Sequence, residues 1–178
     1  MICDVYAKNA KNICLVETWL DPKKETQHDF PKKKLIEASK GRGRGCCVIT
    51  ALDTGILSQS VQDTFQHISF KLTDEIQVTC MYLSSLPSKS DFSVVTTVIK
   101  NVLRRNFSQV IIGDFNFEPG ETNHLSAYLK SIGLLQMVKE PTQIEGRIID
   151  HVYISPKLQG NIDVQIYYPH LIFERQKR

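Results

Sequence analysis

The sequence predicts a mixed α/β domain, with strands in one mixed sheet or in two sheets and with helices packed outside them. Two patterns support this prediction: most apolar segments alternate as half-buried strands do, and two segments change to helical spacing. The chain of 178 residues is 42% hydrophobic and 23% charged, which suits one domain with a sizeable core. This composition is typical of a globular protein and not of a disordered, fibrous or membrane protein.

The first half of the chain is expected to contain mainly strands. Apolar residues between Ile2 and Tyr6 have helical spacing and predict a short helix. Strands are expected at Ile13–Thr18 and at Cys46–Thr50, the second directly after a glycine-rich loop. The alternating segments His67–Leu72 and Ile76–Leu83 predict an antiparallel hairpin.

The second half is expected to alternate between helices and strands. An apolar stripe from Phe92 to Leu103 predicts a helix, and the apolar run from Val110 to Asp114 predicts the strand that follows. A second helix is expected from Leu125 to Ile132, closed by the next glycine. The segments Gly146–Ser155 and Ile162–Tyr168 predict two further strands.

The net charge of +3 permits an acidic partner but does not require one. Much of the excess lies in Lys32–Lys34 and in the KGRGRG stretch from Lys40 to Gly45. Two interpretations remain open for these stretches: solvated basic loops, or a surface that contacts phosphate. The glycine-rich stretch is not a nucleotide-binding loop, because such a loop needs Lys-Ser or Lys-Thr after its last glycine.

Five cysteines occur without a CxxC pair, and four of them lie among apolar residues. Buried free thiols in a reducing compartment explain this pattern best, so we expect an intracellular protein, either nuclear or cytoplasmic. Asp4, Lys8 and Lys11 interrupt the apolar start of the chain, which argues against a signal peptide. No apolar run approaches the ~20 residues of a membrane span, so no membrane partner is expected.

Acidic residues fall on three apolar strand segments. Because strand side chains alternate, Glu17 should share a face with Ile13 and Leu15, and Asp150 should lie on the apolar face of its own strand. Asp114 ends a third apolar strand. A carboxylate on an apolar face is costly unless it is paired, and three that meet at one sheet edge would repel each other. A magnesium or manganese ion would remove that repulsion.

Each acidic residue also has a simpler explanation. Glu17 could accept a bond from a nearby main-chain N–H or a lysine, and Asp150 could pair with a lysine. Asp114 and Asn116 could form an Asx-type turn. Because the pattern repeats on three strands, a shared site is the favoured interpretation.

Several motifs together resemble the endonuclease/exonuclease/phosphatase superfamily. In chain order they are ETWL after an apolar strand, a glycine-rich loop before a strand, MYLSSLP, GDFN, and PTQIEGRIIDHVYIS. The last segment, Pro141 to Ser155, most resembles the endonucleases of eukaryotic mobile elements, such as non-LTR retrotransposons and some Helitron-like elements. The resemblance covers nearly the whole chain, and GDFN followed by IDH is its more specific part.

The resemblance implies a four-layered α/β sandwich over residues 1–178, with the site where two sheets meet. It also implies a phosphodiester hydrolase that depends on Mg²⁺ or Mn²⁺ and acts on DNA. The residues that match site positions of the family are Glu17, Tyr82, Asp114, Asn116, Asp150 and His170.

The roles of these residues are likewise implied by the resemblance. Glu17 would bind the metal together with Asp114, which would also orient or deprotonate the attacking water. Asn116 would bind phosphate, and Asp150 would support the catalytic histidine, His170. In-line hydrolysis of a phosphodiester needs such groups to activate water and to neutralise charge on the phosphoryl oxygens.

The chain departs from the family pattern at both ends. The first strand of the family, with an asparagine for the metal, has no counterpart after Met1, and we expect a sandwich that is incomplete at both ends. Near the other end, Pro169 stands where the family has an aspartate before His170. We therefore expect a truncated and weakly active endonuclease. The alternatives are an inactive remnant that binds nucleic acid, and a phosphatase of the same superfamily that acts on lipids or small phosphoesters.

Overall fold

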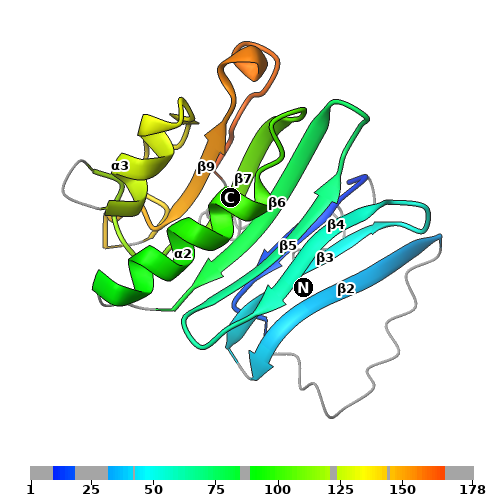
Figure 1. Ribbon diagram of the computed structural model, residues 1–178, viewed down its shortest axis with the longest axis horizontal. Coiled ribbons are helices and arrows are strands. Elements are labelled where there is room, and N and C mark those ends of the chain that lie inside the picture. The colour runs from blue at the N-terminus through cyan, green and yellow to red at the C-terminus, as the bar shows by residue number, and fades with distance from the viewer. Residues whose placement is uncertain are drawn as a thin grey trace, which may run out of the picture.

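Two β-sheets stack face to face, and two helices cover the outer face of the larger sheet (Figure 1). The computed structural model describes residues 10–18, 32–41, 43–84, 89–120, 124–143 and 145–166. The smaller sheet is antiparallel and contains, in spatial order, β1 (Ile13–Val16), β3 (Arg44–Ala51) and β2 (Lys33–Gly41). The larger sheet contains, in spatial order, β4 (Ile56–Val61), β5 (Phe65–Lys71), β6 (Ile76–Leu83), β7 (Ser108–Asp114), β9 (Asp150–Ile154) and β8 (Leu135–Gln136).

The centre of the larger sheet follows the periodicity of the sequence. Strands β5 and β6 form the expected antiparallel hairpin, and β7 then pairs with β6 in parallel. The helix α2 (Lys89–Val102) makes the crossover that a parallel pair requires. The second helix, α3 (His124–Ser131), ends before Gly133, whose φ of 85° is easy for glycine. A short 3-10 turn, η1 (Pro156–Leu158), follows β9.

Alternation along the central strands divides the protein into two cores. On one face of the larger sheet, Phe65, Met81 and Ile111 pack against the helices through Val95 and Leu129. On the other face, apolar side chains pack against the smaller sheet; they include Ile68, Phe70, Val78, Cys80 and Tyr82. The predicted α/β sandwich is therefore confirmed. In the described residues, helices cover the larger sheet only.

The contact between β6 and β7 is very close at Gly113. Its φ is 155°, and a Cβ atom added there would meet the carbonyl oxygen of Met81 at 1.8 Å. Only glycine fits this position without moving a central strand. Gly113 therefore lets β7 carry Asp114 to the end of the sheet in tight register with β6.

Four cysteines lie in or beside the inter-sheet core. Cys14, Cys46, Cys47 and Cys80 are all free thiols, and the last three are buried. Burial raises the pKa of Cys47 to about 12, which keeps this thiol protonated and unreactive at neutral pH. The expectation of free thiols is confirmed for these four, and the expectation of burial is confirmed for Cys46, Cys47 and Cys80.

The basic stretches expected in loops lie largely in strands. Lys33 and Lys34 begin β2, while Arg44 and Gly45 begin β3, so the prediction of two loops was wrong. Strand β2 was not predicted because its side chains are only half buried and its sequence lacks clear alternation. Strands β4 and β8 were also not predicted.

Three other predictions differ from the structure or fall outside it. The strand expected at Ile162–Tyr168 is absent from its described part, Ile162–Ile166, apart from one isolated bridge between Gln159 and Ile162. The helix expected between Ile2 and Tyr6 lies outside the described residues. No helix in the described part of the chain combines the length and the apolarity needed to cross a membrane.

Candidate active site

Three candidate residues form one row across the larger sheet. Tyr82, near the end of β6, is the partner of Asp114 at the end of β7, and Asp114 is the partner of Asp150 at the start of β9. Adjacent strands lie about 4.8 Å apart, so neighbours in this row are close. The side chain of Tyr82 belongs to the inter-sheet core, and Asp150 lines a cavity between the sheets. The row therefore faces the smaller sheet.

Asn116 holds the carboxylate of Asp114. Its main-chain N–H donates a hydrogen bond of 2.8 Å to Oδ1 of Asp114, and its Nδ2 donates to Oδ2 at 3.2 Å and to the carbonyl oxygen of Leu83 at 2.7 Å. Asn116 has a φ of 55°, a left-handed conformation that asparagine tolerates better than most residues. Asp114 and Asn116 therefore form the Asx-type turn, and this turn fixes the carboxylate of Asp114. As placed, the amide nitrogen positions Asp114, a role that differs from the phosphate binding implied by the resemblance.

The environment of Asp114 favours its neutral form. Only 3% of the residue is exposed. Burial raises the pKa of Asp114 to about 7; the hydrogen bond from Asn116 lowers this pKa, whereas the charges of Asp150 and Glu17 raise it further. A carboxyl with a pKa near neutrality can take up and release a proton at physiological pH. Buried carboxyls with raised pKa values are common at functional sites.

Asp150 is fixed by a threonine that the sequence analysis did not single out. The hydroxyl oxygen of Thr142 accepts hydrogen bonds from the main-chain N–H groups of Ile149 and Asp150, at 3.0 and 3.1 Å. Burial raises the pKa of the Asp150 carboxyl, and a side-chain hydrogen bond with Thr142 lowers it. Thr142 is the second residue of the segment Pro141 to Ser155, so the resemblance of that segment to the family could have pointed to it.

Glu17 comes from the opposite sheet. Its charge helps to raise the pKa values of both Tyr82 and Asp114, which places its carboxylate near this row. The predicted alternation was wrong here, because β1 ends at Val16 and Glu17 has a φ of 51°. Cys14 and Val16 face the core, whereas Glu17 is exposed. Strain of this kind in a non-glycine residue often occurs at functional sites.

A tyrosine and an arginine complete the described part of the site. Burial raises the pKa of Tyr82, with further increases from Glu17 and Asp114. The charge of Arg44 and a hydrogen bond with Asn116 act in the opposite direction on this pKa. Tyr82 therefore stays protonated at neutral pH. The positive charge of Arg44 acts on its hydroxyl group. Sequence analysis placed Arg44 in a basic stretch but gave it no place in the site.

Among the described residues, none forms a salt bridge with the acidic residues of the site. Neither Glu17, Asp114 nor Asp150 forms a salt bridge with a described lysine or arginine. Across the described residues, no three His, Cys, Asp or Glu side chains lie close enough together to hold a metal ion by themselves. Magnesium ions usually use only one or two carboxylates and keep several waters. The unneutralised carboxylates fit such a cation, with Glu17 and Asp114 as its candidate protein ligands.

The two histidines of the sequence analysis have different outcomes. His151 is fully buried and stacks on Phe115, with ring centroids 4.5 Å apart, so it belongs to the core. Burial lowers the pKa of His151 to about 4, although hydrogen bonds to the main chain of Ile148 and Phe117 raise it. This environment gives His151 a structural role. His170 and Pro169 lie outside the described residues.

The two basic stretches lie at opposite ends of β2. Lys33 pairs with Ala51, whereas Gly41 pairs with Arg44, and a nine-residue strand spans roughly 26 Å between such ends. Arg44 lies at the end that carries the site. At the far end, the ammonium groups of Lys33 and Lys34 donate hydrogen bonds to the main chain. The bond from Lys34 to the carbonyl oxygen of Thr54 is 2.8 Å long. The two stretches therefore do not flank the site together.

Comparisons with known proteins concern the fold. No protein-family model and no curated protein sequence matches this chain. Its structure is similar to that of the 3′ phosphatase NExo from Neisseria bound to a product DNA hairpin, with a TM-score of 0.60 and 15% identity, over 89% of this chain and 82% of the other. It is also similar to the human Nocturnin catalytic domain, with a TM-score of 0.58 and 12% identity, over 85% of this chain and 71% of the other.

A third similar structure is an AP endonuclease from Archaeoglobus fulgidus. Its TM-score is 0.56 at 14% identity, and the match covers 87% of this chain and 80% of the other. At such identities the likeness shows a shared fold. The fold is the one that the sequence resemblance implied.

Proposed function

We propose, from the endonuclease/exonuclease/phosphatase fold of this chain, that it hydrolyses phosphate esters of nucleic acid at the row formed by Tyr82, Asp114 and Asp150. The observation that carries this proposal is the state of Asp114. It is a buried carboxyl, held by Asn116, with a pKa raised to about 7 by burial. Such a group is suited to accept a proton from water at neutral pH.

Each residue of the row has a part in this chemistry. Asp114 accepts the proton of the attacking water, and Asn116 keeps the carboxylate in the required orientation through its two hydrogen bonds to it. Tyr82 stays protonated and donates a hydrogen bond to a phosphoryl oxygen. Asp150, held by Thr142, keeps the pKa of Asp114 high through its negative charge. A preorganised arrangement of this kind needs little rearrangement during the reaction.

A divalent cation, Mg²⁺ or Mn²⁺, belongs to this proposal. Glu17 and Asp114 would hold it, because their charges repel each other and neither forms a salt bridge with a described lysine or arginine. The pKa of about 7 belongs to Asp114 without the cation, which would lower this pKa and keep the carboxylate ionised as the proton acceptor. When bound, the cation would neutralise charge on the phosphoryl oxygens.

The proposed substrate is DNA. One structure with the same fold holds a product DNA hairpin, and Arg44 supplies a positive charge at the site end of this chain. The finer inference of an endonuclease of mobile-element origin rests on the segment Pro141 to Ser155. Removal of a 3′ phosphate is the second candidate activity, because a structurally similar protein is a 3′ phosphatase.

The test is a cleavage assay on the purified full chain. Supercoiled plasmid reports nicking, and an oligonucleotide hairpin with a 3′ phosphate reports phosphatase activity, each with Mg²⁺ and with EDTA. We expect turnover with Mg²⁺ that both Asp114→Ala and Glu17→Ala reduce by about 100-fold or more. Asp74→Ala is the matched control, because Asp74 is exposed in the β5–β6 turn.

The outcomes separate the alternatives. Activity that both site variants abolish supports the proposal, and the preferred substrate decides between nuclease and phosphatase. No activity with either substrate, together with intact DNA binding, would instead identify a catalytically inactive remnant. Activity that is unchanged in both variants would come from a contaminant and would overturn the assignment of these residues.

A further inference from the structure

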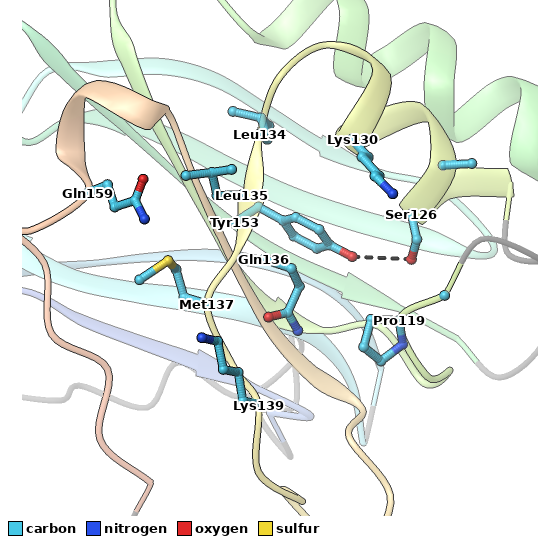
Figure 2. Close-up of a pocket in the computed structure, with 12 residues that line it drawn as sticks. Pro119, Ser126, Lys130, Leu134, Leu135, Gln136, Met137, Lys139, Tyr153 and Gln159 are labelled. Atoms are coloured by element: carbon cyan, nitrogen blue, oxygen red, sulfur yellow. Dashed lines mark hydrogen bonds between the residues drawn. The ribbon is translucent and has the colours of Figure 1, made fainter.

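A second hollow lies on the other face of the larger sheet, away from the candidate active site. It is a cavity of about 490 Å³ between α3, β8, β9 and Gln159, and Figure 2 shows the side chains around it. Side chains on β9 alternate, so Tyr153 lines this cavity while Asp150 and Val152 line the space between the sheets. The volume lies in the range typical of small-molecule sites. The cavity is therefore a separate candidate site.

The most informative group in this cavity is the side-chain amide of Gln136. Both Oε1 and Nε2 are buried, and neither has a hydrogen-bond partner among the described residues. A buried amide without partners is costly, by roughly 1–3 kcal/mol for each group that stays unsatisfied. In Figure 2 the side chain of Gln136 lies among the cavity residues, between Pro119 and Lys139. The amide therefore lies just behind the cavity wall, and a rotation of the Gln136 side chain would turn its donor and its acceptor toward whatever occupies the cavity.

The remaining walls are mainly apolar, with two hydroxyl groups and Lys130 at one end and Lys139 at the other. Leu135, Met137 and Pro119 contribute apolar surface. The hydroxyl groups of Ser126 and Tyr153 lie 3.2 Å apart and form the polar end. Lys139 is exposed and lines the cavity on the side of Gln136.

We propose that this cavity binds a purine nucleotide, with the base edge on the amide of Gln136 and the phosphate on Lys139. A glutamine amide matches the paired acceptor and donor on the edge of adenine, N7 and N6, in a bidentate contact. Apolar walls suit the faces of a flat heterocycle, and the ammonium group of Lys139 suits a phosphate. The same chemistry is offered by a free nucleotide and by a terminal nucleotide of a strand. The proposal does not depend on the hydrolytic activity proposed above, because it concerns binding on the opposite face of β9.

The experiment is calorimetric titration of the full chain with AMP in EDTA, which suppresses turnover. AMP should bind at one site per chain. Adenosine lacks the phosphate and ribose 5-phosphate lacks the base. Each should bind at least about tenfold more weakly than AMP. A short oligoadenylate that competes with AMP would identify a strand end as the source, and one that fails to compete would identify the free nucleotide.

Two variants in the cavity and two controls make the test specific. Gln136→Leu should weaken AMP binding at least about tenfold. Lys139→Gln should weaken binding of AMP but not of adenosine, and it remains informative if Gln136→Leu does not fold. Asp114→Asn and Lys157→Gln, at the candidate active site and on the exposed 3-10 turn, should leave AMP binding unchanged. Absence of AMP binding, or binding that survives both cavity variants, would overturn the proposal, as would loss of binding in Asp114→Asn.

Discussion

Asp114 and Asp150 lie directly opposite each other on the antiparallel strands β7 and β9. Like charges at such positions destabilise a sheet, and the charge of Asp150 contributes to the raised pKa of Asp114. Burial contributes most, so the protein keeps a carboxyl where ionisation at neutral pH is unfavourable. The cost of this arrangement should be visible in the stability of the protein.

Replacement of Asp114 by asparagine should stabilise the protein at high pH. The pKa of Asp114 is about 7 in the folded protein because of burial, and about 4 in the unfolded chain. As pH rises from 4 to 7, the unfolded chain loses this proton while the folded protein keeps it, so the free energy of unfolding falls. At pH 8 without divalent cations, Asp114→Asn should raise the free energy of unfolding by roughly 2–4 kcal/mol. Urea unfolding at pH 8 and pH 4 measures the effect, which should vanish at pH 4.

The control for this prediction is the exposed Asp74, whose replacement by asparagine should change the free energy of unfolding by less than about 1 kcal/mol at either pH. A gain for Asp114→Asn of the same size at pH 4 would contradict the explanation by ionisation.

The buried histidines should stay neutral well into the acid range. Burial lowers the pKa of His67 and of His151 to about 4. Below about pH 6.5 the unfolded chain binds protons that the folded protein does not, so the free energy of unfolding should fall as pH decreases toward 4. Nuclear magnetic resonance should show the ring signals of both residues unchanged between pH 8 and pH 5.5. Titration of either ring near pH 6.5 would contradict the burial described here.

An alanine at position 113 should severely destabilise the fold. Its Cβ would lie 1.8 Å from the carbonyl oxygen of Met81, which is main chain in a central strand and cannot rotate away. We expect a loss of at least about 3 kcal/mol in the free energy of unfolding, at the upper end of overpacking effects. Gly133→Ala is a matched control with positive φ but open space around it, and it should cost only about 1–2 kcal/mol. Equal losses in the two variants would show that contact with Met81 is not the cause.

Two substitutions of Glu17 should differ in their effect on stability but not in their effect on activity. Its φ of 51° strains any residue except glycine, so Glu17→Gly should be more stable than Glu17→Ala by about 1–2 kcal/mol. Both variants should lose the proposed hydrolysis equally, because both lack the carboxylate. Thermal unfolding and the plasmid assay measure the two properties. A more stable alanine variant would exclude strain at this residue.

Arg44 should matter for DNA binding, and Lys34 should not. Arg44 lies at the site end of the smaller sheet, whereas Lys34 lies at the far end of β2. Arg44→Gln should weaken binding and reduce the slope of log affinity against log salt by about one. Lys34→Gln should leave both unchanged. Fluorescence anisotropy with labelled duplex at several salt concentrations provides the measurement, and affinity that does not vary with salt would argue against nucleic acid as partner.

The parts of the fold that were predictable are those whose periodicity reflects burial on one side. Strands β5 and β6 and helix α2 were found because their apolar residues alternate or recur as the cores require. Strand β2 was missed because it is an edge strand whose nine residues are mostly half exposed. Strand β8 has only two residues, which is too short for a period to be seen.

The candidate site could be predicted in composition but not in geometry. Asp114 and Asn116 stood out because an apolar strand ends at them, and the structure joins them by hydrogen bonds. The positive φ of Glu17 could not be foreseen, because it reverses the alternation that the prediction assumed. Arg44 was missed because its contribution depends on strands that are distant in the sequence. Thr142 was missed because its hydrogen bonds to Ile149 and Asp150 depend on a loop conformation, which periodicity does not reveal.

The row of Tyr82, Asp114 and Asp150 faces Glu17 across the junction of two sheets, and this has a consequence for how the protein matures. Glu17 can approach Asp114 and Asp150 only after the smaller sheet has docked, because Glu17 enters with β1 whereas the two aspartates arrive with β7 and β9. Docking of the small sheet thus brings mutually repelling charges together, and loop-closure entropy opposes the same step. Ion binding at that junction would favour the docked state, so the cation would act as a folding cofactor as well as a chemical one.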